Sequence, residues 1–212
     1  MGLEDRFIEL THLAGSLARQ AADASEHSVL VAGSVPPLSE SYRPDMVPPA
    51  AEAAPIYAEV VQALGDHVDL FICETMSSGA EALNAATAAV DHGNGKPVYV
   101  SWTLLETPGA GLRSGESIAD AFALLNDLPI DGFLFNCTHP SAVTERIRSF
   151  RRLTDKPVGG YANRLNPREE GWTLDNEVPM GVDRSLDVSA FVAAGIECVD
   201  AGANMIGGCC GV

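Results

Sequence analysis

Six short apolar runs alternate along the chain with segments that carry helical signals, and this alternation constrains the fold more than any other feature. The runs end near residues 33, 73, 102, 136, 161 and 206. Units of a strand followed by a helix predict a parallel sheet, because parallel neighbours need a crossover that returns the chain to the same end. Two architectures satisfy this pattern: an open doubly wound sheet and a (β/α)8 barrel.

The segments between the runs predict helices. Residues 1–24 carry apolar side chains at steps of four and three residues, which indicates an amphipathic helix. Ser78 with Glu81, and Ser117 with Asp120, are N-terminal capping patterns. Further helices are predicted over residues 50–65, 78–93, 117–125 and 141–153, with a last helix that ends near residue 201.

Polar or thiol side chains close one predicted strand after another. A barrel gathers functional residues from many strand ends on one rim, whereas an open sheet gathers them mostly at a switch point. The distribution favours the barrel, and no GxGxxG or P-loop pattern supports a nucleotide site. The residues in question are Ser34, Glu74, Ser101, Asn136, Cys137, Asn163, Cys209 and Cys210.

A barrel needs eight strands, and the sequence predicts six. The chain starts on a helix, so the simplest account places the two missing strands before residue 1. The expected fold class is therefore α/β of the (β/α)8 TIM-barrel type, incomplete, with strands three to eight present. We expect a single barrel domain over residues 1–212, truncated at the N-terminus and after the last strand.

Composition limits the classes of partner. The 212 residues suffice for one domain with a real core. A net charge of −16 argues against nucleic acid or an anionic membrane as a partner. No apolar run approaches the roughly 20 residues of a membrane helix, and the N-terminus lacks the features of a signal peptide. The five cysteines are therefore interpreted as reduced thiols of a cytoplasmic protein.

Three of the cysteines predict a metal site. Cys137 ends one strand-like run, and Cys209 and Cys210 end another between flanking glycines, which allow close backbone approach. Three thiolates form a soft ligand set that selects zinc and leaves a fourth position open. Such an anionic site activates water poorly but suits a substrate thiol, which zinc binds as the thiolate. The matching reaction is alkyl transfer to sulfur.

Other interpretations of the cysteines remain open. A single cysteine is most often a small buried apolar residue, and Cys73 and Cys198 are interpreted in that way. A redox-active disulfide between the adjacent Cys209 and Cys210 is one alternative to a metal site. A non-catalytic zinc- or thiol-binding barrel fragment is the alternative from another functional class.

These motifs together resemble the homocysteine S-methyltransferase family. The resemblance rests on Gly207–Gly211, Asn136–Cys137, Glu74–Thr75 and Val31–Ser34, and it extends over essentially the whole chain. Members of that family are (β/α)8 barrels whose zinc is held by one cysteine after strand six and a pair after strand eight. The resemblance thus implies that Cys137, Cys209 and Cys210 hold zinc.

The resemblance also implies substrate contacts. The strand-four glutamate of the family contacts the homocysteine amino group, and Glu74 matches it. Asn136 and Asn163 match family asparagines, and we expect Thr75 and Ser34 to line the same substrate site. No catalytic residue beyond the metal site is expected.

The implied reaction is zinc-dependent methyl transfer from a sulfonium donor to L-homocysteine, which gives methionine. Residues 101–103 and 113–117 resemble the branch that uses S-methylmethionine or S-adenosylmethionine. Ala162 stands where the family often has proline, and Val35–Pro37 replaces a glycine-proline turn, so another thiol with another donor, such as betaine, stays an alternative. Without the first two strands we expect poor activity alone, and a partner chain or edge-to-edge dimerisation could fill the gap.

Overall fold

The described part of the chain forms one parallel sheet. The computed structural model describes residues 2–167, 172 and 180–212. Six strands follow one another in the sheet in chain order, and every neighbouring pair is parallel. The strands are β1 (Ala32–Val35), β2 (Leu70–Met76), β3 (Val98–Trp102), β4 (Gly132–Asn136), β5 (Val158–Ala162) and β6 (Met205–Gly208).

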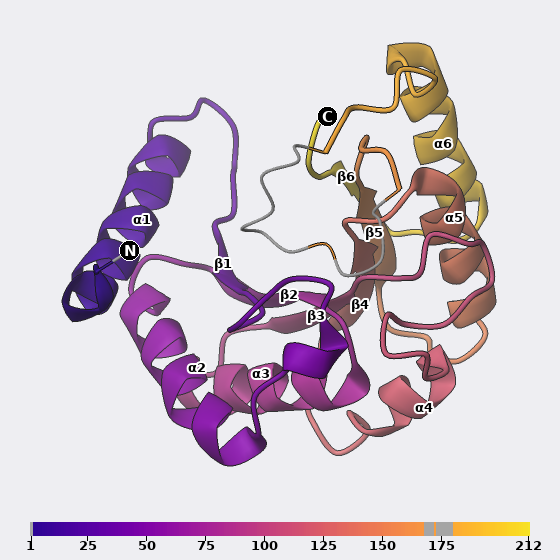
Figure 1. Ribbon diagram of the computed structural model, residues 1–212. Helices are drawn as coiled ribbons and strands as arrows, with labels where there is room; N and C mark the ends of the chain where they lie inside the picture. Colours follow the sequence, from indigo (N-terminus) through magenta and orange to yellow (C-terminus); the bar gives the residue numbers. More distant parts are fainter. Residues whose placement is uncertain (1, 168–171, 173–179) are drawn as a thin grey trace.

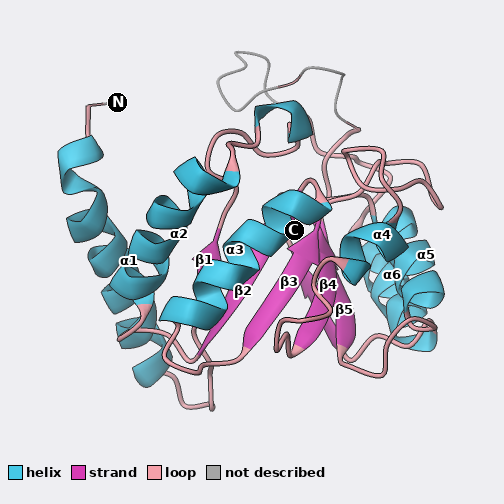
Figure 2. Ribbon diagram, turned by 90° about the horizontal axis from the view of Figure 1, so that it is seen from below, coloured by secondary structure: helices cyan, strands magenta, loops and turns pink. Residues whose placement is uncertain are grey.

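Helices connect the strands and lie on the outer side of the sheet. The sheet curls around a common interior, with α1 at the β1 end and α6 at the β6 end of the curve (Figures 1 and 2). An open doubly wound sheet would carry helices on both faces, so the incomplete-barrel prediction is confirmed. The helices are α1 (Phe7–Asp23), α2 (Ala50–Leu64), α3 (Gly79–His92), α4 (Ile118–Ala123), α5 (Pro140–Phe150) and α6 (Val188–Asp200), with 3-10 turns at Glu4–Arg6 and Pro44–Met46.

Most predicted element ends agree with the structure, and two differ. Both capping patterns are confirmed, since the Ser78 side chain accepts from the Glu81 N–H and the Ser117 side chain from the Asp120 N–H. The α-helix predicted over residues 1–24 begins only at Phe7, after the 3-10 turn. The strand predicted from residue 28 begins at Ala32, because residues 28–30 are exposed and lie outside the ladder.

The strand register separates a face that packs under the helices from an interior face of mixed polar and apolar side chains. Residues in register on parallel neighbours point to the same side of the sheet, and successive residues alternate sides. Side chains on the outer side pack under the helices, and those on the inner side face the interior of the curl. One outer row, fully or almost fully buried, consists of Val35, Cys73, Val100, Phe133 and Val158.

Both ends of the sheet carry apolar surface. Beside β1, a cavity of about 630 Å³ lies between α1, α2 and the strand, lined by residues such as Phe7, Leu10 and Val60. At the other end, α6 exposes a stripe at spacings of four and three residues: Val188, Val192, Ile196 and Val199. Among the described helices, none is long and apolar enough to cross a bilayer.

Candidate functional site

Three cysteine sulfurs meet at the carboxyl end of the sheet. Cys137 directly follows β4, and Cys209 and Cys210 directly follow β6. Their Sγ atoms lie within 4.8 Å of one another: Cys137 to Cys209 is 2.6 Å, Cys137 to Cys210 is 3.9 Å, and Cys209 to Cys210 is 3.7 Å. Parallel strands bring together thiols that stand 72 and 73 residues apart in the sequence.

The thiol cluster has the donor set and most of the geometry of a tetrahedral zinc site. Zinc–sulfur bonds of about 2.3 Å place the sulfurs of a tetrahedron about 3.8 Å apart. Two of the three separations agree with this value, and the third requires Cys137 and Cys209 to move apart by about 1 Å. Cys137 is buried and Cys210 exposed, so the cluster is open toward solvent on one side. Among the described residues, no disulfide involves these three cysteines.

The neighbouring thiol disfavours ionisation of Cys209 when no cation is bound. The adjacent Cys137 thiol, followed by burial, raises the pKa of the Cys209 thiol. A bound divalent cation reverses this effect, because it stabilises thiolates directly. The three sulfurs therefore form a donor set that fits a thiolate-bound cation.

The end of β5 holds both thiol-bearing segments through its backbone. The Cys137 N–H donates to the Tyr161 carbonyl at 3.3 Å, and the Cys209 N–H donates to the Ala162 carbonyl at 2.9 Å. The Arg164 N–H donates to the Cys210 carbonyl at 2.9 Å. The cysteine backbones are thus fixed from one central strand. Cys137 itself has φ +52°, in the left-handed region that non-glycine residues seldom occupy.

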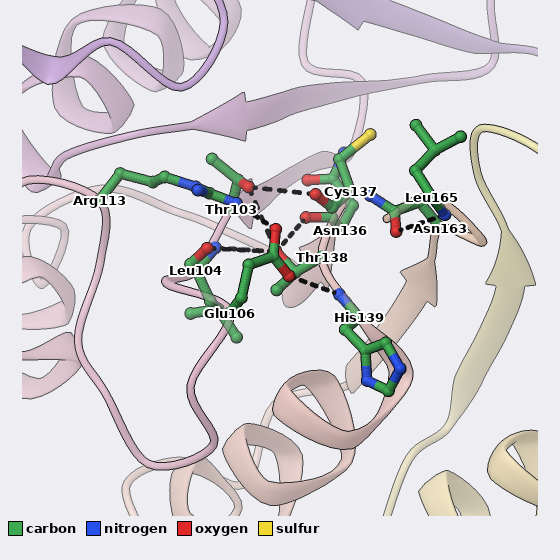
Figure 3. A network of polar contacts seen from close by, with 10 residues as sticks. All are labelled: Thr103, Leu104, Glu106, Arg113, Asn136, Cys137, Thr138, His139, Asn163 and Leu165. Carbon is green, nitrogen blue, oxygen red and sulfur yellow. Dashed lines mark hydrogen bonds and ion pairs between the residues drawn. The ribbon is translucent and has the colours of Figure 1, made fainter. Parts of the chain in front are cut away.

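A buried polar network supports the segment after Cys137 (Figure 3). The Thr138 hydroxyl lies 3.2 Å from the Thr103 hydroxyl and accepts from the Leu104 N–H at 3.0 Å. Glu106 accepts from the His139 N–H at 3.1 Å and pairs with Arg113 at 2.8 Å. These contacts anchor the loop after β3 to the segment that carries the first thiol.

Glu74 projects into the interior from β2. Its Oε1 accepts from the Ser34 hydroxyl at 2.5 Å, and its Oε2 accepts from the Tyr161 hydroxyl at 2.9 Å. Ser34, Glu74 and Tyr161 line one cavity of about 300 Å³, together with Gly207 and Gly208 of the strand that leads into Cys209. The carboxylate and the thiol-bearing strand therefore border the same interior space.

The side chain of Asn136 forms hydrogen bonds with Thr75, the residue after Glu74. Its Oδ1 accepts from the Thr75 N–H at 3.0 Å and from the Ser101 hydroxyl at 2.8 Å, and its Nδ2 donates to the Thr75 hydroxyl at 2.8 Å. Thr75 has φ +63°, and the register of β2 shifts between Cys73 and Met76. The strand alternates regularly through Ile72 and Glu74, which line the same cavity, and the irregularity follows at Thr75 and Met76.

Asn163 lies on the other side of the thiol segment. It is buried, its N–H donates to the Thr138 carbonyl at 3.1 Å, and its Oδ1 accepts from the Leu165 N–H at 3.3 Å (Figure 3). The substrate contacts predicted for Asn136, Thr75 and Asn163 stay predictions. What the structure shows is that these side chains hold the backbone around the cluster.

Two cysteines outside the cluster are buried, and one tyrosine joins the site. Cys73 is fully buried in the outer row of β2, and Cys198 is buried on α6 with its Sγ 3.2 Å from the Thr144 hydroxyl. Their interpretation as core residues is confirmed. Sequence reasoning missed Tyr161. The sequence signal that could have indicated Tyr161 is its position at the end of β5, where it is in register with Asn136 at the end of β4.

Comparison with known proteins gives the family. The sequence model of the family described as "Homocysteine S-methyltransferase" matches residues 1–212. Homocysteine S-methyltransferase 4 of Zea mays is 29% identical over 143 residues, which cover 67% of this chain and 40% of the maize protein. The chain therefore spans less than half of the length of this curated relative.

Solved structures agree in fold. The apo form of the homocysteine methyltransferase MmuM from Escherichia coli superposes with a TM-score of 0.75 at 24% identity, covering 100% of this chain and 72% of MmuM. Its metallated form gives a TM-score of 0.75 at 24% identity, covering 97% of this chain and 67% of MmuM.

Fold and site together define a protein of the TIM-barrel class with a cluster of three thiols at the carboxyl ends of its strands. With the family match over all 212 residues, the chain belongs to the homocysteine S-methyltransferase family.

Proposed function

We propose that this protein transfers a methyl group from a sulfonium donor to the thiol of L-homocysteine in a zinc-dependent reaction that gives methionine. The main support is structural: the thiols of Cys137, Cys209 and Cys210 cluster at the strand ends, and the Glu74 carboxylate lines a cavity beside the strand that leads to Cys209. Family membership supports the same reaction. We further expect the protein to act in the cytoplasm on small molecules.

Cys137, Cys209 and Cys210 are the residues that would hold zinc. When bound, zinc supplies a Lewis acid that keeps a substrate thiol in its nucleophilic thiolate form at neutral pH. The protein contributes a fixed ligand backbone, since β5 carbonyls accept from the Cys137 and Cys209 N–H groups. The exposed side of Cys210 leaves room for the substrate sulfur to approach.

Glu74 would bind the ammonium of homocysteine. A carboxylate that accepts one hydrogen bond at each oxygen is held in one orientation and keeps lone pairs for a further donor. When Glu74 holds the ammonium group of homocysteine, it also limits where the sulfur of the same homocysteine molecule can lie. Alignment of two bound reactants replaces a bimolecular encounter and supplies a large part of the rate.

The charge of the site favours a cationic methyl donor. Three thiolates and Glu74 leave the interior negative even with a divalent cation, which attracts a positive sulfonium and disfavours an anionic donor. S-methylmethionine and S-adenosylmethionine both meet this requirement. Methyl transfer then breaks the donor C–S bond, forms the homocysteine C–S bond and releases the neutral thioether.

The second candidate is a non-catalytic zinc- or thiol-binding protein. The observation that favours it is the apolar surface at both ends of the sheet, beside β1 and on α6. If the protein is instead a methyltransferase, covering those surfaces should raise its activity. We then expect a version extended at its N-terminus by about 80 residues, the size of two β/α units, to transfer methyl groups faster.

The test is methyl transfer to isotopically labelled homocysteine. Zinc-loaded protein is incubated with backbone-deuterated homocysteine and one donor at a time, S-methylmethionine, S-adenosylmethionine or betaine, and deuterated methionine is measured by mass spectrometry. We expect deuterated methionine with a sulfonium donor, its loss in Cys209→Ser and its retention in the matched core variant Cys198→Ser. Stoichiometric zinc binding without labelled methionine, in the extended version as well, would favour the non-catalytic candidate.

A further inference from the structure

Tyr161 contacts both halves of the candidate site. Its hydroxyl donates to Glu74 Oε2 at 2.9 Å, and its backbone carbonyl accepts from the Cys137 N–H at 3.3 Å. In register it stands between Asn136 on β4 and Gly207 on β6. One residue of β5 is therefore bonded to the proposed ammonium-binding carboxylate and to a thiol-bearing segment.

The bond from Tyr161 to Glu74 crosses the interior. Glu74 belongs to β2 and Tyr161 to β5, and two strands lie between them in the sheet. Both side chains line the 300 Å³ cavity, so the bond spans its wall at the level where the strands end. The carboxylate is thereby held from a point on the far side of the curl.

Each oxygen of the Glu74 side chain accepts one hydrogen bond, and the Tyr161 hydroxyl is the donor to Oε2. Ser34 donates to the other carboxylate oxygen at 2.5 Å. With one donor on each oxygen, the carboxylate plane is fixed, and the remaining lone pairs are available to an ammonium.

We propose that Tyr161 is a positioning residue that aims Glu74 at the ammonium of an amino-acid thiol. Because its backbone also holds the Cys137 segment, it fixes the span between the ammonium site and the thiol cluster. The substrate class it selects is a thiol that carries an α-amino group at that span. This inference rests on the proposed function, since it concerns the same site.

The experiment measures binding rather than turnover. The zinc-loaded 212-residue chain is titrated in a calorimeter with L-homocysteine and with 4-mercaptobutanoate, which has the same thiol and carboxylate but no amino group. Tyr161→Phe removes only the hydroxyl. The control Tyr99→Phe removes a hydroxyl from a β3 tyrosine in register with Ile72, below the level of Glu74.

We expect Tyr161→Phe to weaken homocysteine binding roughly tenfold and to leave 4-mercaptobutanoate binding and zinc content unchanged. Tyr99→Phe should bind both thiols as the wild type does. In a Glu74→Gln background, Tyr161→Phe should change homocysteine binding by less than about twofold, because the carboxylate that it positions is gone. Ser34→Ala, which removes the other donor, should also weaken homocysteine selectively.

Three results would overturn the inference. Equal weakening for both thiols would mean that Tyr161 acts on the thiol cluster or on general structure. An undiminished effect in the Glu74→Gln background would mean that it acts independently of the carboxylate. Wild-type affinity for homocysteine in Tyr161→Phe would remove the positioning role and leave the proposed function intact, whereas a wild type that binds no homocysteine would refute both.

Discussion

The side chain of Asn136 holds Thr75 in a left-handed backbone conformation. The Thr75 N–H donates to Asn136 Oδ1 at 3.0 Å, and Asn136 Nδ2 donates to the Thr75 hydroxyl at 2.8 Å. A β-branched residue at φ +63° costs on the order of 1–3 kcal/mol. The paired hydrogen bonds offset this cost and hold the strand irregularity directly after Glu74.

Asn136→Ala should destabilise the protein by about 1–3 kcal/mol, because it leaves the buried Thr75 N–H without its acceptor. The measurement is the free energy of unfolding from urea titration. The control Asn126→Ala, at an exposed position, should change the free energy by no more than about 0.5 kcal/mol. Equal values for the two variants would show that the amide does not support Thr75.

Zinc content tests the thiol cluster. We expect one zinc per chain, and Cys137→Ser, Cys209→Ser and Cys210→Ser should each lower zinc affinity by more than the roughly 10- to 100-fold that loss of an outer-shell partner costs. Cys73→Ser and Cys198→Ser are matched controls that should retain the metal. Metal analysis after dialysis against a weak chelator gives the comparison, and full occupancy in Cys209→Ser would remove that residue from the ligand set.

Glu74→Gln should cost about 2–5 kcal/mol in homocysteine binding, because the substrate ammonium loses its charged partner in the interior cavity. Binding of 4-mercaptobutanoate should be unaffected, and the exposed Glu52→Gln should bind both thiols normally. Calorimetric titration of the zinc-loaded variants measures both. If Glu74→Gln does not discriminate between the two thiols, the carboxylate has a role other than ammonium recognition.

Attachment of α1 should depend on pH through Asp69. The Val31 N–H, followed by the Arg19 guanidinium on α1, lowers the pKa of Asp69 below its ordinary value. A lowered folded-state pKa means stabilisation that is present above an unfolded-state pKa of about 4 and lost as the pH falls below it.

Asp69→Asn should therefore lower the urea midpoint at pH 7, and this difference from the wild type should shrink at pH 3. Asp23→Asn, which removes a longer and more exposed contact of the same arginine, should have the smaller effect at pH 7. A difference for Asp69→Asn that is as large at pH 3 as at pH 7 would contradict the linkage.

Sequence patterns were sufficient for the order of the elements and for the meeting of the three thiols. Alternating strands and helices permit few topologies, and parallel strands place their carboxyl ends on one rim. Cys137 and the pair at 209–210 each directly follow a strand, so the rim brings them together without further information. The capping serines were predictable because their hydrogen bonds are local.

What the sequence did not reveal depends on contacts between distant residues. The bulge at Thr75 is stabilised from Asn136, 61 residues away, and the Tyr161 bond reaches Glu74 across 87 residues. Side-chain alternation within one strand carries no information about such partners. The start of β1 was placed too early because residues 29–31 are apolar, although Val29 and Leu30 are exposed in the structure.

The most direct test of the central claim is X-ray absorption at the zinc edge, recorded for the zinc-loaded chain before and after addition of homocysteine. We predict three protein sulfurs at about 2.3 Å, joined by a fourth sulfur when homocysteine is added. The spectrum of Cys209→Ser should lack one of the protein sulfurs. A wild-type sulfur count that does not change with homocysteine would contradict the proposal that this cluster binds the substrate thiol.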